Sequence, residues 1–80
     1  MKWIRIAQQP RDGTKKTSVY DVRTADEIQH LGEIRFYPRW RKYAFYPRPD
    51  TLYEQDCLRD IAQFCEESTA QWRKGLKAMR

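Results

Sequence analysis

The sequence predicts an α+β domain, in which an antiparallel four-stranded meander is followed by one C-terminal helix packed on one face of the sheet. Four short segments alternate apolar and polar residues with a period of two, which is typical of half-buried strands. After residues 47–50 the period changes to 3.6, which indicates an amphipathic helix. The connections are short, which favours antiparallel neighbours, and the 80 residues form one domain, 1–80. The predicted order is therefore ββββα.

The first two strands are expected over residues 2–8 and 17–24, as a hairpin. Residues 10–16 supply turn formers and charges, which predicts an exposed, mobile loop between them. Alternation assigns these side chains to the inner face: Ile4, Ile6, Tyr20 and Val22. It assigns these to the outer face: Trp3, Arg5, Ala7, Val19, Asp21 and Arg23. The outer face of such a two-layer domain is left to solvent or to a partner.

The third and fourth strands are expected over residues 31–37 and 42–46. Proline cannot donate to a sheet ladder, so Pro38 and Pro47 end these strands, and residues 38–41 form the turn between them. The inner set is Ile34, Phe36, Tyr43 and Phe45. The outer set is Leu31, Glu33, Arg35, Tyr37, Lys42, Ala44 and Tyr46. Because the fourth strand has aromatic residues on both faces, the opposite facing of this strand stays open.

A single helix is expected over residues 52–75. Its apolar stripe consists of Leu58, Ile61, Ala62, Cys65, Thr69, Trp72 and Leu76, with Phe64 and Ser68 at the margin. Thr51 and Glu54 have the spacing of a capping box, which would begin the helix. Gly75 indicates fraying, so residues 76–80 are expected to be loose.

Positive charge is concentrated in the part of the chain that forms the sheet. The net charge is +5, and residues 1–50 carry all of this excess, because residues 51–80 hold equal numbers of bases and acids. Residues 35–48 contain five bases, six aromatic residues and no acid. Cations neutralise phosphates and rings stack on bases, so this composition favours a nucleic-acid partner. A surplus of bases also serves solubility alone, and half of the rings are expected in the core.

The sequence therefore predicts a binding site on the outer face and at the turn of the second hairpin. Its expected residues are Trp3, Arg5, Arg35, Tyr37, Arg39, Trp40, Arg41 and Lys42. The first hypothesis is a non-catalytic module that binds nucleic acid. The alternative is a protein-interaction module, because Trp and Arg are enriched at interface hot spots. The third hypothesis is self-association, in which a second copy of the chain binds through an exposed strand edge.

The residue patterns that would predict catalysis, a cofactor or a metal site are missing from the sequence. His30 is the single histidine, and Cys57 and Cys65 form no C-x-x-C pair. On one helix the cysteines would lie roughly 12 Å apart, so we expect buried thiols rather than a disulfide. No apolar stretch approaches ~18 residues, and no signal-peptide pattern begins the chain, so we expect a cytoplasmic protein without a membrane partner.

The second half of the chain resembles small, mostly uncharacterised proteins encoded by bacteriophages and other mobile elements. Their approximate pattern is LGxIxWY, then WRxYxFxP, then T followed by CLxDIxxF. The matching residues are Leu31, Gly32, Ile34, Phe36, Tyr37, Trp40, Arg41, Tyr43, Phe45, Pro47, Thr51, Cys57, Leu58, Asp60, Ile61 and Phe64. Phe36 replaces the more usual Trp. The resemblance implies a mobile-element accessory protein, such as a nucleic-acid-binding factor or an inhibitor of host defence, and it assigns no functional residue.

Overall fold

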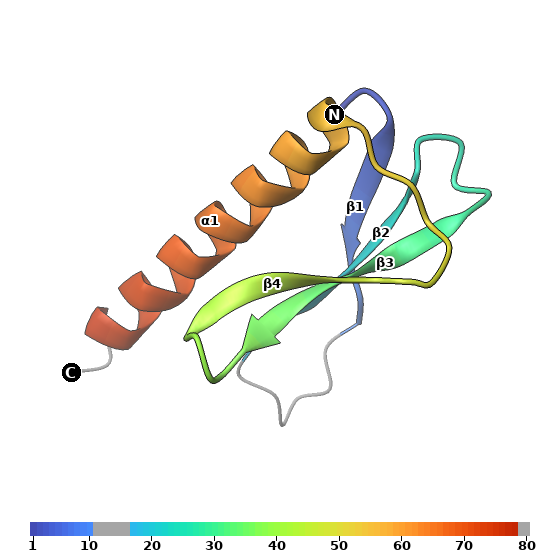
Figure 1. Ribbon diagram of the computed structural model, residues 1–80. Coiled ribbons are helices and arrows are strands. Elements are labelled where there is room, and N and C mark those ends of the chain that lie inside the picture. The colour runs from blue at the N-terminus through green and yellow to red at the C-terminus, as the bar shows by residue number, and fades with distance from the viewer. Residues whose placement is uncertain (11–16, 79–80) are drawn as a thin grey trace.

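A computed structural model of the protein, which describes residues 1–10 and 17–78, contains a four-stranded sheet covered on one face by a helix (Figure 1). The elements in chain order are β1 (Ile4–Gln8), β2 (Val19–Thr24), β3 (His30–Tyr37), β4 (Lys42–Pro47) and α1 (Gln55–Ala78). The sheet has the order β1-β2-β3-β4, and all neighbours are antiparallel. The predicted α+β meander with one C-terminal helix is confirmed. Residues 11–16 of the loop predicted over residues 10–16 lie outside the described residues.

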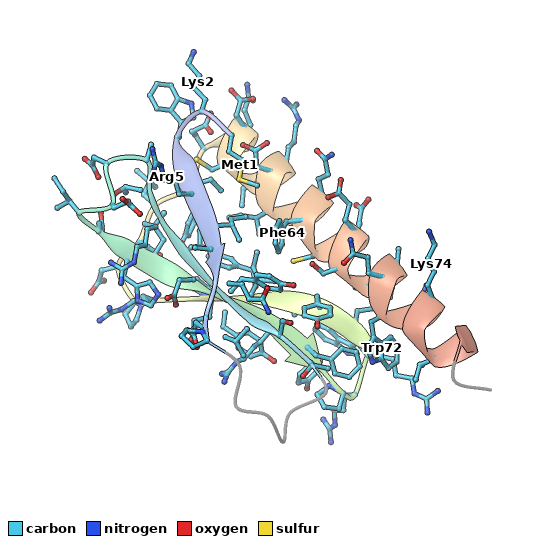
Figure 2. All side chains as sticks on the ribbon, turned by 180° about the vertical axis from the view of Figure 1, so that it is seen from behind. Met1, Lys2, Arg5, Phe64, Trp72 and Lys74 are labelled. Atoms are coloured by element: carbon cyan, nitrogen blue, oxygen red, sulfur yellow. The ribbon has the colours of Figure 1, made fainter. Side chains whose placement is uncertain are left out.

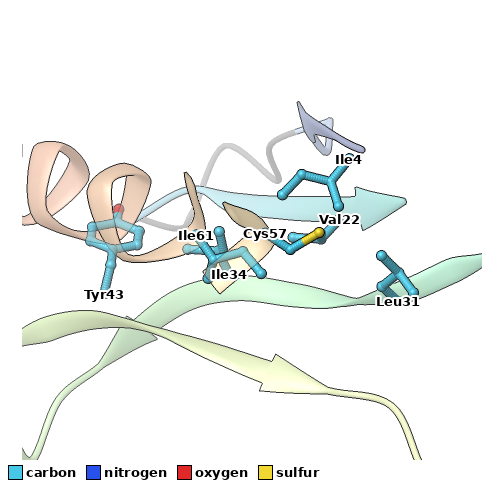
Figure 3. Close-up of a cluster of buried hydrophobic side chains, with 7 residues drawn as sticks. All are labelled: Ile4, Val22, Leu31, Ile34, Tyr43, Cys57 and Ile61. Atoms are coloured by element: carbon cyan, nitrogen blue, oxygen red, sulfur yellow. The ribbon is translucent and has the colours of Figure 1, made fainter. Parts of the chain in front are cut away.

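The core lies between the inner face of the sheet and α1. Its buried cluster consists of Ile4, Val22, Leu31, Ile34, Tyr43, Cys57 and Ile61 (Figure 3). Ile34 is fully buried because it pairs with Tyr20 on one side and Phe45 on the other. Larger rings surround this cluster, and each adds more buried area than an aliphatic side chain, which compensates for the small size of the domain. The predicted facing of β4, with Tyr43 and Phe45 inward, is confirmed.

Leu31 was expected on the outer face, and this expectation is wrong. The pairing of β2 with β3 shifts between Val22, which pairs with Gly32, and Arg23, which pairs with His30. Leu31 is the extra residue of this β-bulge, which turns its side chain inward, where it is 5% exposed. A period of two cannot reveal such an insertion.

The buried side of α1 differs from the predicted stripe. Ile61 and Thr69 of the predicted stripe are buried, and so are Ser68 from its margin and Cys57 from outside it. Leu58 and Leu76, which the stripe included, are 51% and 42% exposed. The helix lies closest to the edge strand β4, so its flank beyond this edge has no strand beneath it. By their spacing, Leu58 and Leu76 lie on the same side of the helix as Cys65. The apolar pattern therefore included them, although this side extends past the edge of the sheet.

The ends of α1 also differ from the prediction. Glu54, and not Thr51, caps the helix, because the Glu54 carboxylate accepts a hydrogen bond from the Cys57 N–H at 2.6 Å. The Thr51 hydroxyl instead donates to the Arg48 carbonyl at 2.8 Å. The helix continues through Gly75 to Ala78, so the fraying expected from this glycine onward does not occur over residues 76–78. Within the described part of the chain, no helix is both long enough and apolar enough to cross a membrane.

Candidate functional site

The turn between β3 and β4 presents a tryptophan to solvent. The Arg41 N–H donates to the Pro38 carbonyl at 3.2 Å, and Arg41 adopts a left-handed conformation with φ 53°, which closes the turn. Trp40 packs back on Tyr37, with ring centroids 4.7 Å apart and planes at 73°. Even so, Trp40 is 67% exposed. The turn therefore holds an indole ring in place while leaving most of its surface available.

The cations around this ring have no acidic partner among the residues that the structure describes. Among the described residues, no ion pair involves Arg35, Arg39, Arg41 or Lys42, and Arg39, Arg41 and Lys42 are exposed. Arg35 lies over the Tyr46 ring, with its guanidinium carbon 4.1 Å from the centroid. We define the hairpin patch as the five residues at the tip: Tyr37, Arg39, Trp40, Arg41 and Lys42. It combines positive charge, which no described acid pairs with, and exposed aromatic surface.

Trp3 and Arg5, which the sequence analysis placed in the same site, lie at the opposite end of the sheet. Arg5 is aligned with Arg23 and His30, and Tyr37 follows His30 by seven positions along β3. At about 3.3 Å per residue this spacing is roughly 23 Å. Figure 2 likewise shows Arg5 far from Trp72, which packs under the hairpin on Phe36 with ring centroids 4.5 Å apart.

These two residues also have partners of their own. The Arg5 guanidinium lies 3.8 Å from the Glu27 carboxylate, and the Lys2 ammonium lies 5.1 Å from the Trp3 ring centroid. The structure thus brings together six of the eight predicted residues, namely Arg35 and the five residues of the hairpin patch. It leaves Trp3 and Arg5 outside.

An acidic centre divides the outer face of the sheet. Asp21 and Glu33 are directly opposite each other on β2 and β3, and the Gln9 amide donates to both carboxylates at 2.7 Å. His30 Nε2 lies 3.3 Å from Asp21 Oδ1. The outer face is therefore not a continuous positive stripe. The sequence contained the signal for this, because both acids fall on the outer set of neighbouring strands.

A groove separates the edge of β4 from α1 next to the hairpin patch. Its volume is about 280 Å³, and it is lined by Lys42, Tyr43, Cys65, Glu66, Thr69, Ala70 and Arg73. The Thr69 hydroxyl accepts a hydrogen bond from the Tyr43 N–H at 2.9 Å and donates to the Cys65 carbonyl at 2.8 Å. We call this space the β4–α1 groove. Sequence reasoning missed it, because α1 was assigned no role beyond covering the core.

The thiols are poorly suited to nucleophilic chemistry. Burial raises the pKa of Cys65, and burial also raises the pKa of Cys57, so both remain protonated near neutral pH. Among residues 1–10 and 17–78, no three His, Cys, Asp or Glu side chains are grouped so that they could hold a metal ion.

Comparison of the chain with protein-family models, with curated proteins and with solved structures finds no match. The resemblance to phage-encoded proteins therefore stays a prediction.

Proposed function

We propose that the protein is a nucleic-acid-binding module that uses the hairpin patch as its contact surface. The observation that carries this proposal is Trp40, which is 67% exposed although Tyr37 holds it in place. Arg39, Arg41 and Lys42 surround it, and no described acid pairs with them. An exposed ring provides a stacking surface for a base, while neighbouring cations contact the phosphates.

The charge of the site determines how strongly salt should weaken binding. The hairpin patch and Arg35 supply four cations. If each cation contacts one phosphate, the logarithm of the affinity falls with the logarithm of salt concentration with a slope of about −2.8 for a single strand. Binding should then weaken about 50-fold between 50 and 200 mM salt.

The test is a fluorescence anisotropy titration of single- and double-stranded DNA and RNA at both salt concentrations. Trp40→Ala should weaken binding roughly 5- to 160-fold, because stacking of one base on an aromatic side chain contributes about 1–3 kcal/mol. Trp3→Ala is the matched control, since Trp3 is 50% exposed at the other end of the sheet. Absence of micromolar binding at 50 mM salt would refute the proposal, as would equal effects of the two substitutions.

A protein-interaction module is the second candidate, and a different surface favours it. Ile28 and Leu52 are 83% and 92% exposed. Ile28 also lines an open cavity of about 560 Å³ together with His30 and Arg48. Thr51, the chain neighbour of Leu52, lines the same cavity, and a contiguous apolar patch there would suit a protein partner. A host protein retained by the immobilised chain after nuclease treatment, and lost on Ile28→Ser, would favour an accessory or host-defence-inhibitor role.

A further inference from the structure

We infer that the bound nucleic acid is single-stranded, and that its backbone passes from Trp40 around the edge of β4 into the β4–α1 groove. This inference rests on the proposed function and deepens it. Lys42 carries the argument, because it belongs to the hairpin patch and also lines the groove. The exposed ring and the groove are thus joined by a cation at the edge of the sheet.

The groove has the size and charge for one nucleotide unit. Its volume of about 280 Å³ lies just below the range for drug-sized ligands, which is about 300–1,000 Å³. Lys42 and Arg73 line it from the strand and from the helix, and no ion pair joins either to a described acid. Two cations on opposite walls suit a phosphate or a sugar-phosphate segment.

The position of the groove selects a flexible strand over a duplex. Trp40 contacts Tyr37, which is on the outer face of the sheet, whereas Cys65 and Arg73 belong to the helix on the inner face. A polymer that contacts both must bend around the edge of β4. Duplex DNA has a persistence length of about 50 nm and resists such a bend, whereas a single strand does not. Stacking on Trp40 also requires a base that is free of its stack.

Glu66 is the one acid among the described residues that line the groove, and its charge opposes phosphate binding. It is exposed and lines the groove on α1, together with Arg73. A carboxylate in this place repels a phosphate in the groove, so its neutralisation should strengthen binding there. Glu66→Gln should therefore raise the affinity for the nucleic acid, whereas the loss of a cation should lower it. A general destabilisation of the fold cannot raise the affinity.

The first experiment compares a fluorescent 12-nucleotide thymidine oligomer with a duplex of equal length, using anisotropy at 50 and 200 mM salt. Arg73→Gln should weaken binding of the oligomer about 8-fold at the lower salt and about 3-fold at the higher, as expected for one lost phosphate contact. Arg5→Gln is the control, because it removes the same charge at the other end of the sheet. Glu66→Gln should bind more tightly than the unmodified chain.

The second experiment uses Cys65 as a probe of the groove. Alkylation by iodoacetamide at alkaline pH, followed by peptide mapping, reports Cys65 and Cys57 separately; the thymidine oligomer should slow alkylation of Cys65 at least several-fold. Cys57 is 7% exposed in the core and serves as the internal reference. Absence of any binding refutes the proposed function. Trp40-dependent binding with an unprotected Cys65, equal effects of Arg73→Gln and Arg5→Gln, or tighter binding of the duplex overturns this inference alone.

Discussion

Thr69→Val should destabilise the fold, because the Thr69 hydroxyl joins α1 to the edge of β4. Thr69 is 7% exposed, and its hydroxyl accepts from the Tyr43 N–H at 2.9 Å. Valine has nearly the same shape and provides no acceptor for this N–H. The loss of a buried hydrogen-bond partner costs about 1–3 kcal/mol, and the added methyl group offsets part of that, so we expect a net loss of about 1–2 kcal/mol.

Denaturation measured by circular dichroism would detect this loss. For a domain of this size, about 1–2 kcal/mol corresponds to a melting temperature lower by roughly 4–16 °C. The urea midpoint should fall by about 1–2 M if the slope is near 1 kcal/mol/M. The same hydrogen bond holds the helix against the strand. Iodoacetamide should therefore alkylate Cys65 faster in this variant than in the unmodified chain.

Ser68→Ala is the matched control for this substitution. Ser68 is the neighbouring residue of α1 and is similarly buried, at 9% exposed. Its hydroxyl makes no hydrogen bond to any residue that the structure describes. If Thr69→Val melts at the same temperature as Ser68→Ala, then the strand-to-helix hydrogen bond contributes nothing, and the structural reasoning about the edge of β4 is wrong.

Three further perturbations test other parts of the structure. Gly32→Ala should destabilise the domain by about 1–3 kcal/mol in urea denaturation, because the new methyl group would overlap the Tyr46 carbonyl oxygen and lie 2.9 Å from the Phe45 ring. The hydrogen bond from the Cys57 N–H lowers the pKa of Glu54, so the stability gained from this cap is complete above about pH 4.5 and is lost as pH falls through the lowered pKa. The difference in stability between Glu54→Ala and the unmodified chain should therefore shrink as the pH falls from about 6 to about 3. A difference that stays constant over this range would contradict the role of Glu54 as the cap. Pro47→Ala, added to the valine substitution above, should produce a concentration-dependent mass in light scattering, because it restores a donor to the outer edge of β4.

The expectation for Pro47 follows from the register of β4. The Tyr43 N–H points away from β3, toward α1, so alternation directs the backbone of Phe45 and Pro47 to the same outer edge. Tyr43 donates to Thr69, and proline has no N–H. The structure describes all of β4. Besides the Tyr43 N–H, the only backbone donor of β4 at this outer edge is therefore the Phe45 N–H. This arrangement opposes the self-association that an exposed edge strand would favour.

The sequence predicted the layers of the fold well, because alternation and the change of period follow directly from which faces are buried. Where it failed, the cause was tertiary. Leu31 turns inward at a β-bulge, and the insertion of one residue leaves no mark in a periodic pattern. Leu58 is apolar yet exposed, because the sheet ends at β4 and leaves that flank of α1 uncovered.

The candidate site was predictable only in part, again because of tertiary packing. Arg39, Trp40 and Arg41 are adjacent in the chain, so a turn necessarily brings them together. Trp3 was assigned to the same site only because it lies on the same face of the sheet. The face of a residue does not determine at which end of the sheet the residue lies. Arg73 approaches Lys42 through the packing of α1 across the sheet, which no spacing in the sequence encodes.

The acidic centre of the outer face gives the strongest reason for a path around β4. Directly opposed carboxylates on neighbouring strands are destabilising, and the Gln9 amide that donates to both Asp21 and Glu33 offsets this repulsion. A phosphate chain that crossed the outer face from the hairpin patch toward Arg5 would meet these two acids midway. Toward the edge of β4 it would meet Lys42 and then Arg73. The charge distribution therefore favours the short route over the edge, and in the proposed function the outer face of the sheet is a boundary of the binding site.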